Sequence, residues 1–94
     1  MAKWRNEITD RLIKTIVDLK DSDEAYMFFE DLCTVKEIKE MAQRLQVASL
    51  LKQNKSYQEI SAVTGVSAAT ISRVSRCLNY GTGGYDTVLN KEEN

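Results

Sequence analysis

SYQEISAVTGVSAATISRVSRCL, residues 56–78, consists of two short segments in which apolar residues recur at helical spacing, joined by a turn. Ser56 and Glu59 have the spacing of a capping box, so we expect the first helix to begin after Ser56. Gly65 stands where this helix must end, because glycine adopts the left-handed conformation of such turns without strain. Ser67 is a suitable N-cap for the second helix. The stretch therefore predicts a helix-turn-helix over residues 56–78.

The two faces of the predicted motif differ in chemistry. The buried stripe is expected to contain Ile60, Val63, Val66, Ile71, Val74 and Leu78. The opposite face of the second helix is small, hydroxylic and basic, which suits close approach to base edges and contact with phosphates. We predict base readout by Ala68, Ala69 and Ser72. The full set of predicted DNA-binding residues is Gln58, Ser61, Ser67, Ala68, Ala69, Ser72, Arg73 and Arg76. An ordinary helical hairpin with a basic exposed face is the alternative.

The composition of the chain narrows the possible fold classes and functions. The chain has 94 residues, no proline and few glycines, so we expect one all-α domain over residues 1–94. No long apolar run predicts a membrane span or a signal peptide, and we expect a cytoplasmic protein. Histidine is absent, and Cys33 and Cys77 lack metal-ligand spacing, so the sequence predicts neither a metal site nor an enzyme. Both cysteines are expected to be small buried hydrophobes.

Charge is distributed unevenly along the chain, although the net charge is only −1. Residues 1–34 hold five Lys or Arg against eight Asp or Glu, whereas residues 35–79 hold seven against three. Positive charge therefore gathers around the predicted helix-turn-helix, as phosphate contact requires. Chance sorting over short windows is the alternative.

The other segments also show helical spacing. We expect a helix over 4–19, a short helix over 24–32 capped by Ser22 or Asp23, and a long helix over 34–54. Thr34 and Glu37 form a second capping box at the start of the long helix. The short helix, rich in aromatic residues, is expected to be deeply buried. The end of the chain is predicted as a flexible loop over 79–84, a last short helix around Tyr85, Val88 and Leu89, and frayed residues 90–94.

From about Leu32 to Leu78 the chain resembles the Trp repressor family, and most closely its Trp-repressor-related YerC/YecD group. The residues that carry the resemblance are Leu32-Cys33-Thr34, Arg44, Gln58-Glu59-Ile60 and Ala69-Thr70-Ile71-Ser72-Arg73. The resemblance implies an intertwined, all-helical homodimer whose helix-turn-helix motifs project from a shared core. The long helix supports this expectation, because the short helices of one chain cannot cover it.

The resemblance also implies a small-molecule site. Thr34, Arg44 and Arg73 match the family residues around the corepressor, although they also have ordinary structural roles as an N-cap, an exposed helix residue and a phosphate contact. Val74 stands where the family has a glycine that makes room for the indole ring of tryptophan. We therefore expect DNA binding without tryptophan, with a smaller ligand still able to use the three residues for its carboxylate.

The resulting prediction is a dimeric, sequence-specific DNA-binding transcriptional regulator, and a repressor in particular. Two other classes of protein have the same pattern: a protein-interaction module built on a helix-turn-helix, and a non-specific DNA-binding protein. A protein that reads DNA loses affinity for duplex DNA steeply as salt rises, which distinguishes it from a protein-interaction module. A non-specific DNA-binding protein is distinguished by equal affinity for random and selected duplexes.

Overall fold

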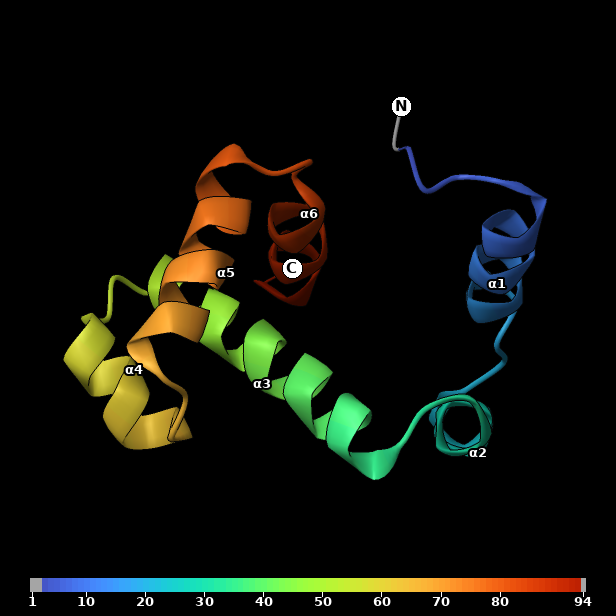
Figure 1. Ribbon diagram of the computed structural model, residues 1–94, viewed down its shortest axis with the longest axis horizontal. Coiled ribbons are helices and arrows are strands. Elements are labelled where there is room, and N and C mark those ends of the chain that lie inside the picture. The colour runs from blue at the N-terminus through green and yellow to red at the C-terminus, as the bar shows by residue number, and fades with distance from the viewer. Residues whose placement is uncertain (1–2, 94) are drawn as a thin grey trace. The chain divides into compact units, whose positions relative to one another are not determined.

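A computed structural model describes residues 3–93, and within this range the chain forms six α-helices and no strand (Figure 1). They are α1 (Glu7–Val17), α2 (Ser22–Leu32), α3 (Val35–Lys52), α4 (Tyr57–Thr64), α5 (Ala68–Tyr80) and α6 (Gly84–Glu93). The predicted all-α fold is confirmed. The chain divides into two compact units, Met1–Ile38 and Lys39–Asn94, and α3 belongs to both.

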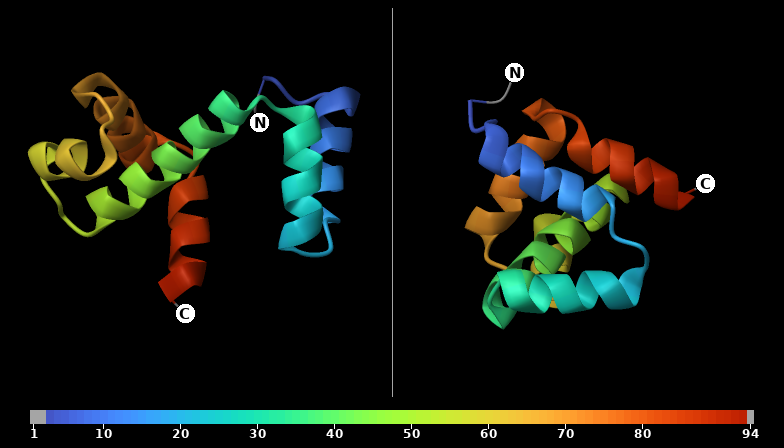
Figure 2. Two further views of the ribbon diagram at one scale, coloured as in Figure 1. Left: turned by 90° about the horizontal axis from the view of Figure 1, so that it is seen from below. Right: turned by 90° about the vertical axis from the view of Figure 1, so that its right-hand side faces the viewer.

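In the second unit, α4, α5 and α6 gather around the C-terminal half of α3 (Figures 1 and 2). Every one of these helices contributes to a single cluster of buried aliphatic side chains. The cluster consists of Val47, Ala48, Ile60, Val66, Ile71, Val74 and Leu89. The helix α5 packs against both α4 and α6, so it connects these two helices within the unit.

The turn between α4 and α5 forms as predicted. The Ser56 N–H donates to the Glu59 carboxylate at 2.9 Å, and the Glu59 N–H donates to Ser56 Oγ at 3.1 Å, which completes the capping box. Gly65 has φ +72°, and its N–H donates to the Ser61 carbonyl at 2.8 Å. Ser67 caps α5, with its Oγ accepting from the Thr70 N–H at 3.3 Å. These contacts end one helix and start the next within three residues.

The prediction that Val63 belongs to the buried stripe is wrong. Val63 is 66% exposed, whereas Ile60 is fully buried. The reason is that Val66, in the turn, folds back into the cluster, so Ile60 and Val66 together cover the end of the core. In α5, Ile71 and Val74 are buried as predicted, and Leu78 is half-buried.

The helix α3 begins with the predicted second capping box. The Thr34 N–H donates to the Glu37 carboxylate at 2.8 Å, and the Glu37 N–H donates to Thr34 Oγ1 at 3.1 Å. The bond from the Thr34 backbone, followed by the bond with its side chain, lowers the pKa of Glu37 below its ordinary value of 4.5. The charged form of the cap thus persists below that pH and is lost only as the pH falls through the lowered pKa. At its other end α3 stops at Lys52 rather than at the predicted residue 54, because Asn54 turns the chain with φ +63°.

The C-terminal segment is more helical than predicted. The helix α5 continues to Tyr80 and α6 begins at Gly84, which leaves a shorter loop than the predicted 79–84. Residues 90–93, predicted to fray, belong to α6, and Asn94 lies outside the described residues. Lys52 holds α6 to the end of α3, because its Nζ donates to Asn90 Oδ1 at 2.8 Å and lies 3.2 Å from Asp86 Oδ1.

The first unit differs from its prediction in the helix starts and in burial. Asn6 caps α1, so this helix is shorter than the predicted 4–19, and Asp21 caps α2 in place of Ser22 or Asp23. No residue of α1 or α2 is buried, so the expectation of a deeply buried α2 is wrong for the single chain. Met27 is 62% exposed, although Phe28 and Phe29 pack edge to face with ring centroids 5.7 Å apart.

Both cysteines are free thiols, and only one of them approaches the predicted burial. Cys33 is half-buried, but Cys77 is exposed on α5, three residues after the core residue Val74. Cys77 also lies six residues after the buried Ile71, a rotation of about 600°, which places it about 120° from Ile71 around the helix and away from the buried face. Within residues 3–93, no helix is long and apolar enough to cross a membrane.

The two glycines Gly65 and Gly84 allow a matched test of the turn. A Cβ at Gly65 meets no atom within 4 Å, so Gly65→Ala adds only the strain of a left-handed backbone, and we expect a loss of about 1 kcal/mol in the free energy of unfolding. Gly84 has no such backbone constraint and lies in a helix, so Gly84→Ala should be neutral or stabilising. Urea denaturation measures both. Equal stabilities for the two variants would contradict the assigned role of Gly65.

Candidate functional site

The residues predicted to bind DNA share the outer side of the α4–turn–α5 segment. Their positions follow from the core, because burying Ile71 and Val74 turns the other side of α5 outward. Exposed side chains are Gln58 on α4, Ser67 at the cap, and Ala68, Ala69, Ser72, Arg73 and Arg76 on α5. Ser61, near the end of α4, is half-buried.

The exposed face of α5 is positively charged and sterically open. Positions 69, 72, 73 and 76 follow the three- and four-residue spacing that places side chains on one helical face. Within the part of the chain that the structure describes, no carboxylate pairs with Arg73 or Arg76. Alanine and serine around these arginines leave the helix backbone accessible. The face can therefore lie close to a polyanion while the guanidinium groups reach its charges.

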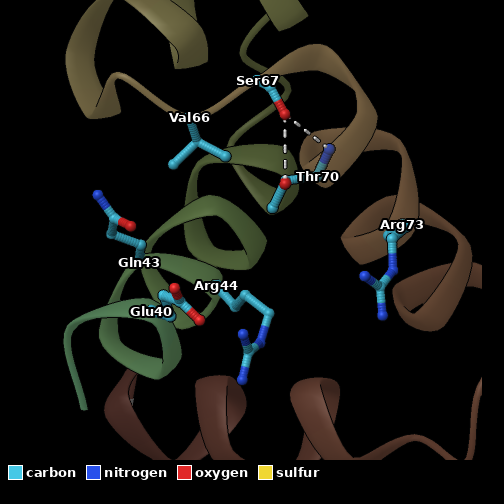
Figure 3. Close-up of a pocket in the computed structure, with 7 residues that line it drawn as sticks. All are labelled: Glu40, Gln43, Arg44, Val66, Ser67, Thr70 and Arg73. Carbon is cyan, nitrogen blue, oxygen red and sulfur yellow. Dashed lines mark hydrogen bonds between the residues drawn. The ribbon is translucent and has the colours of Figure 1, made fainter. Parts of the chain in front are cut away.

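A pocket of about 390 Å³ lies between α3 and the start of α5 (Figure 3). Its lining residues are Glu40, Gln43, Arg44, Val66, Ser67, Thr70 and Arg73. Figure 3 shows Arg44 extending from α3 and Arg73 from α5, with Ser67 and Thr70 at the start of α5 joined by hydrogen bonds of 3.3 Å. All but one of the lining side chains are polar or charged, so the pocket is suited to a polar ligand.

The structure brings together two of the three predicted ligand residues. Arg44 and Arg73 both line the pocket, whereas Thr34 belongs to the other unit and is not among the lining residues. Thr34 Oγ1 accepts the Glu37 N–H, which engages one of the two lone pairs of this hydroxyl in the cap of α3. Val74 is also not part of the lining and is only 2% exposed in the aliphatic cluster.

Sequence reasoning missed several pocket residues. Glu40, Gln43 and Thr70 were not predicted as part of a ligand site, and Ser67 was predicted only as a DNA contact. The sequence contained a signal for Glu40 and Gln43, because their spacing places them on the same face of α3 as Arg44. Thr70 precedes the core residue Ile71 and faces the pocket from the first turn of α5.

The side chains of this chain that could coordinate a metal ion are those of cysteine, aspartate and glutamate. Between residues 3 and 93, no group of three or more cysteine, aspartate or glutamate side chains is arranged to hold a metal ion. The pocket itself contains a single carboxylate, that of Glu40.

Comparison with known proteins shows what the chain is similar to. The family model of the Trp repressor protein matches residues 7–93. The uncharacterized protein YerC of Bacillus subtilis (strain 168) is 49% identical over 89 residues, which cover 95% of this chain and 86% of YerC.

Solved structures agree with this relationship. The crystal structure of a TrpR like protein from Eubacterium eligens ATCC 27750 is 47% identical, with a TM-score of 0.94 over 97% of this chain and 94% of that one. A Staphylococcus aureus structure is 44% identical, with a TM-score of 0.93 over 97% of this chain and 91% of the other. The predicted resemblance is confirmed, and the chain belongs to the Trp repressor family.

Proposed function

We propose that this chain is a sequence-specific DNA-binding transcriptional regulator, in particular a repressor, that works as a homodimer. The observation that carries the proposal is the exposed face of α5, where Arg73 and Arg76 stand among small side chains outside the buried stripe of Ile71 and Val74. In this proposal α4 and α5 form a helix-turn-helix, and α5 enters the major groove of double-stranded DNA. The proposed location of the protein is the cytoplasm. Membership of a family of regulators rather than enzymes supports this assignment.

Within the motif, the roles divide by side-chain chemistry. Ala68, Ala69 and Ser72 are short enough to lie against base edges, and the serine hydroxyl can both donate and accept a hydrogen bond there. Arg73 and Arg76 supply charge to the phosphates. The remaining contacts, to phosphates or flanking bases, come from Gln58, Ser61 and Ser67.

The homodimer is supported by the apolar surface that a single chain leaves exposed. In α1, Ile8 is 82% and Val17 74% exposed, and in the middle of α3 Met41 and Leu45 are more than one-third exposed. Large apolar side chains clustered along helices in this way are typical of a surface that another subunit covers. A shared core would also give α2 the burial that the single chain lacks.

Tryptophan is not required in this proposal. Val74 occupies the position of the family's glycine, and it is already packed in the core with Ile71 and Leu89. Its burial helps to fix α5 in the absence of a ligand. We therefore propose that the chain binds DNA without tryptophan, and that no other cofactor is needed for binding itself.

We expect sedimentation at micromolar concentration to show a species of twice the chain mass. The physical basis of the expected dimer is the burial of the apolar faces of α1 and α3. Leu45→Glu should weaken association, whereas Gln46→Glu, at the neighbouring exposed polar position of α3, should have a much smaller effect. A compact, folded monomer of the native chain would contradict the dimer.

Arg76→Ala should weaken binding to all duplexes about equally. Each lost phosphate contact reduces the slope of log K against log salt by about 0.9, and a dimer loses two such contacts. Fluorescence anisotropy over a salt series measures the slope, with Arg11→Ala on α1 as the matched control that leaves it unchanged. A changed sequence preference with an intact slope would reassign Arg76 to base readout.

Calorimetry with tryptophan tests the role of Val74. We expect no tight binding by the native chain and measurable binding by Val74→Gly, since the substitution removes the side chain that fills this position. The glycine variant should lose about 2–4 kcal/mol of stability, so Val74→Ala provides a less disruptive second variant. Tight tryptophan binding by the native chain, coupled to a large gain in DNA affinity, would overturn the proposal.

A further inference from the structure

The hydroxyl of Thr64, the last residue of α4, bridges two parts of the turn that leads to α5. Its Oγ1 donates to the Ile60 carbonyl at 2.7 Å and accepts the Val66 N–H at 3.1 Å. Both bonds are partly buried. One side chain therefore connects the last turn of α4 to the backbone of the residue that returns the chain to the core.

Thr64 occupies a position where the helical repeat favours an aliphatic side chain. It lies one turn after the fully buried Ile60 and is itself half-buried, whereas its neighbour Val63 is 66% exposed. A hydroxyl in a partly buried place costs free energy unless it is hydrogen-bonded. The two bonds of Thr64 meet this condition, so the chain has a polar connection across Gly65 in place of additional apolar burial.

The Val66 N–H depends on this hydroxyl. Val66 is 8% exposed, and within residues 3–93 the structure gives its N–H no backbone acceptor, only Thr64 Oγ1. Leaving a backbone N–H unpaired in such a place is unfavourable, so loss of the hydroxyl favours a shift of the turn toward water. Ser67, the N-cap of α5, follows directly, and the same shift moves the start of α5.

A shift of α5 has a consequence for DNA that rests on the proposed function. Arginine reaches a phosphate through a long flexible stem, which can follow a small movement of the helix. Ala68, Ala69 and Ser72 are short, so their distance from base edges changes directly with the position of α5. Base contacts carry the sequence information, and phosphate contacts do not. The position of α5 therefore governs discrimination between sequences more than overall attraction.

We propose that Thr64 is a positioning residue for sequence discrimination. Its hydroxyl holds the start of α5 where the short side chains meet base edges, and it acts through Val66 and Ser67 rather than by contact with DNA. This role adds Thr64 to the residues of the proposed interface, although its side chain is half-buried and belongs to neither the basic nor the small outer face.

Thr87 provides a matched control. Its Oγ1 donates to the carbonyl four residues earlier, that of Gly83, at 2.9 Å, as Thr64 does to Ile60. Between residues 3 and 93, no backbone N–H donates to the Thr87 hydroxyl. Thr87→Val, at an exposed position of α6, therefore removes the same bond to a preceding carbonyl without removing a bridge across a turn.

Two duplexes of equal length separate discrimination from attraction, one selected from random DNA by the native chain and one of random sequence. Fluorescence anisotropy over a salt series gives both affinities, at a temperature where urea denaturation shows every variant to be folded. Thr64→Val should weaken binding to the selected duplex by about three- to tenfold relative to the random one, the range for one hydrogen bond, with the salt slope unchanged. Thr64→Ser keeps the hydroxyl and should restore most of the native preference, and Thr87→Val should retain it.

Amide hydrogen exchange shows where each variant acts. Exchange at Val66 and in the first turn of α5 should accelerate in Thr64→Val, while the amides around Val47 and Ala48 stay slow. If Thr64→Val does not fold, Thr64→Ala takes its place, because it also removes the hydroxyl. Faster exchange throughout the chain, with equal losses for both duplexes, would reduce Thr64 to a general stabilising role and overturn the proposal.

The remaining outcomes distinguish this inference from the proposed function. If the native chain prefers the selected duplex and Thr64→Val keeps the full preference, or if serine fails to restore a lost one, this inference falls and the proposed function stands. Equal binding of both duplexes by the native chain would contradict the proposed function, and the role of Thr64 in discrimination would fall with it.

Discussion

The packing of Val47 and Ala48 on α3 against Ile60, Ile71 and Val74 is the contact on which the C-terminal unit depends. Four helices meet in this cluster of seven buried side chains, so each one matters more than it would in a large core. Burial of one such aliphatic side chain contributes about 1.5–3 kcal/mol. Leu89, at 4% exposure, joins α6 to the same cluster, and Lys52 adds polar contacts with Asp86 and Asn90 at its edge.

This core also determines which side of α5 faces outward. Once Ile71 and Val74 are inside, the helical repeat leaves Ala69, Ser72 and Arg73 outside, whatever they bind. The tight turn at Gly65 is needed for the same reason, because a longer connection would not return Val66 to the cluster next to Ile60. The position of the proposed recognition surface is therefore a consequence of how the core packs.

Features encoded by neighbouring residues could be predicted from the sequence, and features that depend on distant packing could not. Both capping boxes and the left-handed Gly65 follow from local backbone hydrogen bonding, and the structure confirms them. Val63 fits the helical spacing but is exposed, because Val66 returns to the core only in three dimensions. The pocket lining also depends on distant packing, and only part of it was predicted. Arg44 and Arg73 were predicted from the family resemblance, whereas the only sequence signal for Glu40 was its spacing on the face of α3.

Arg73 and Arg76 are both exposed on α5, but their surroundings differ. Arg73 lines the pocket between α3 and α5, whereas Arg76, three residues further along the helix, is not part of that lining. In the proposed function both guanidinium groups contact phosphates, and only that of Arg73 does so beside side chains of α3. The position of Arg73 therefore depends on how α5 packs against α3, and the burial of Val47, Ile71 and Val74 in one cluster fixes that packing.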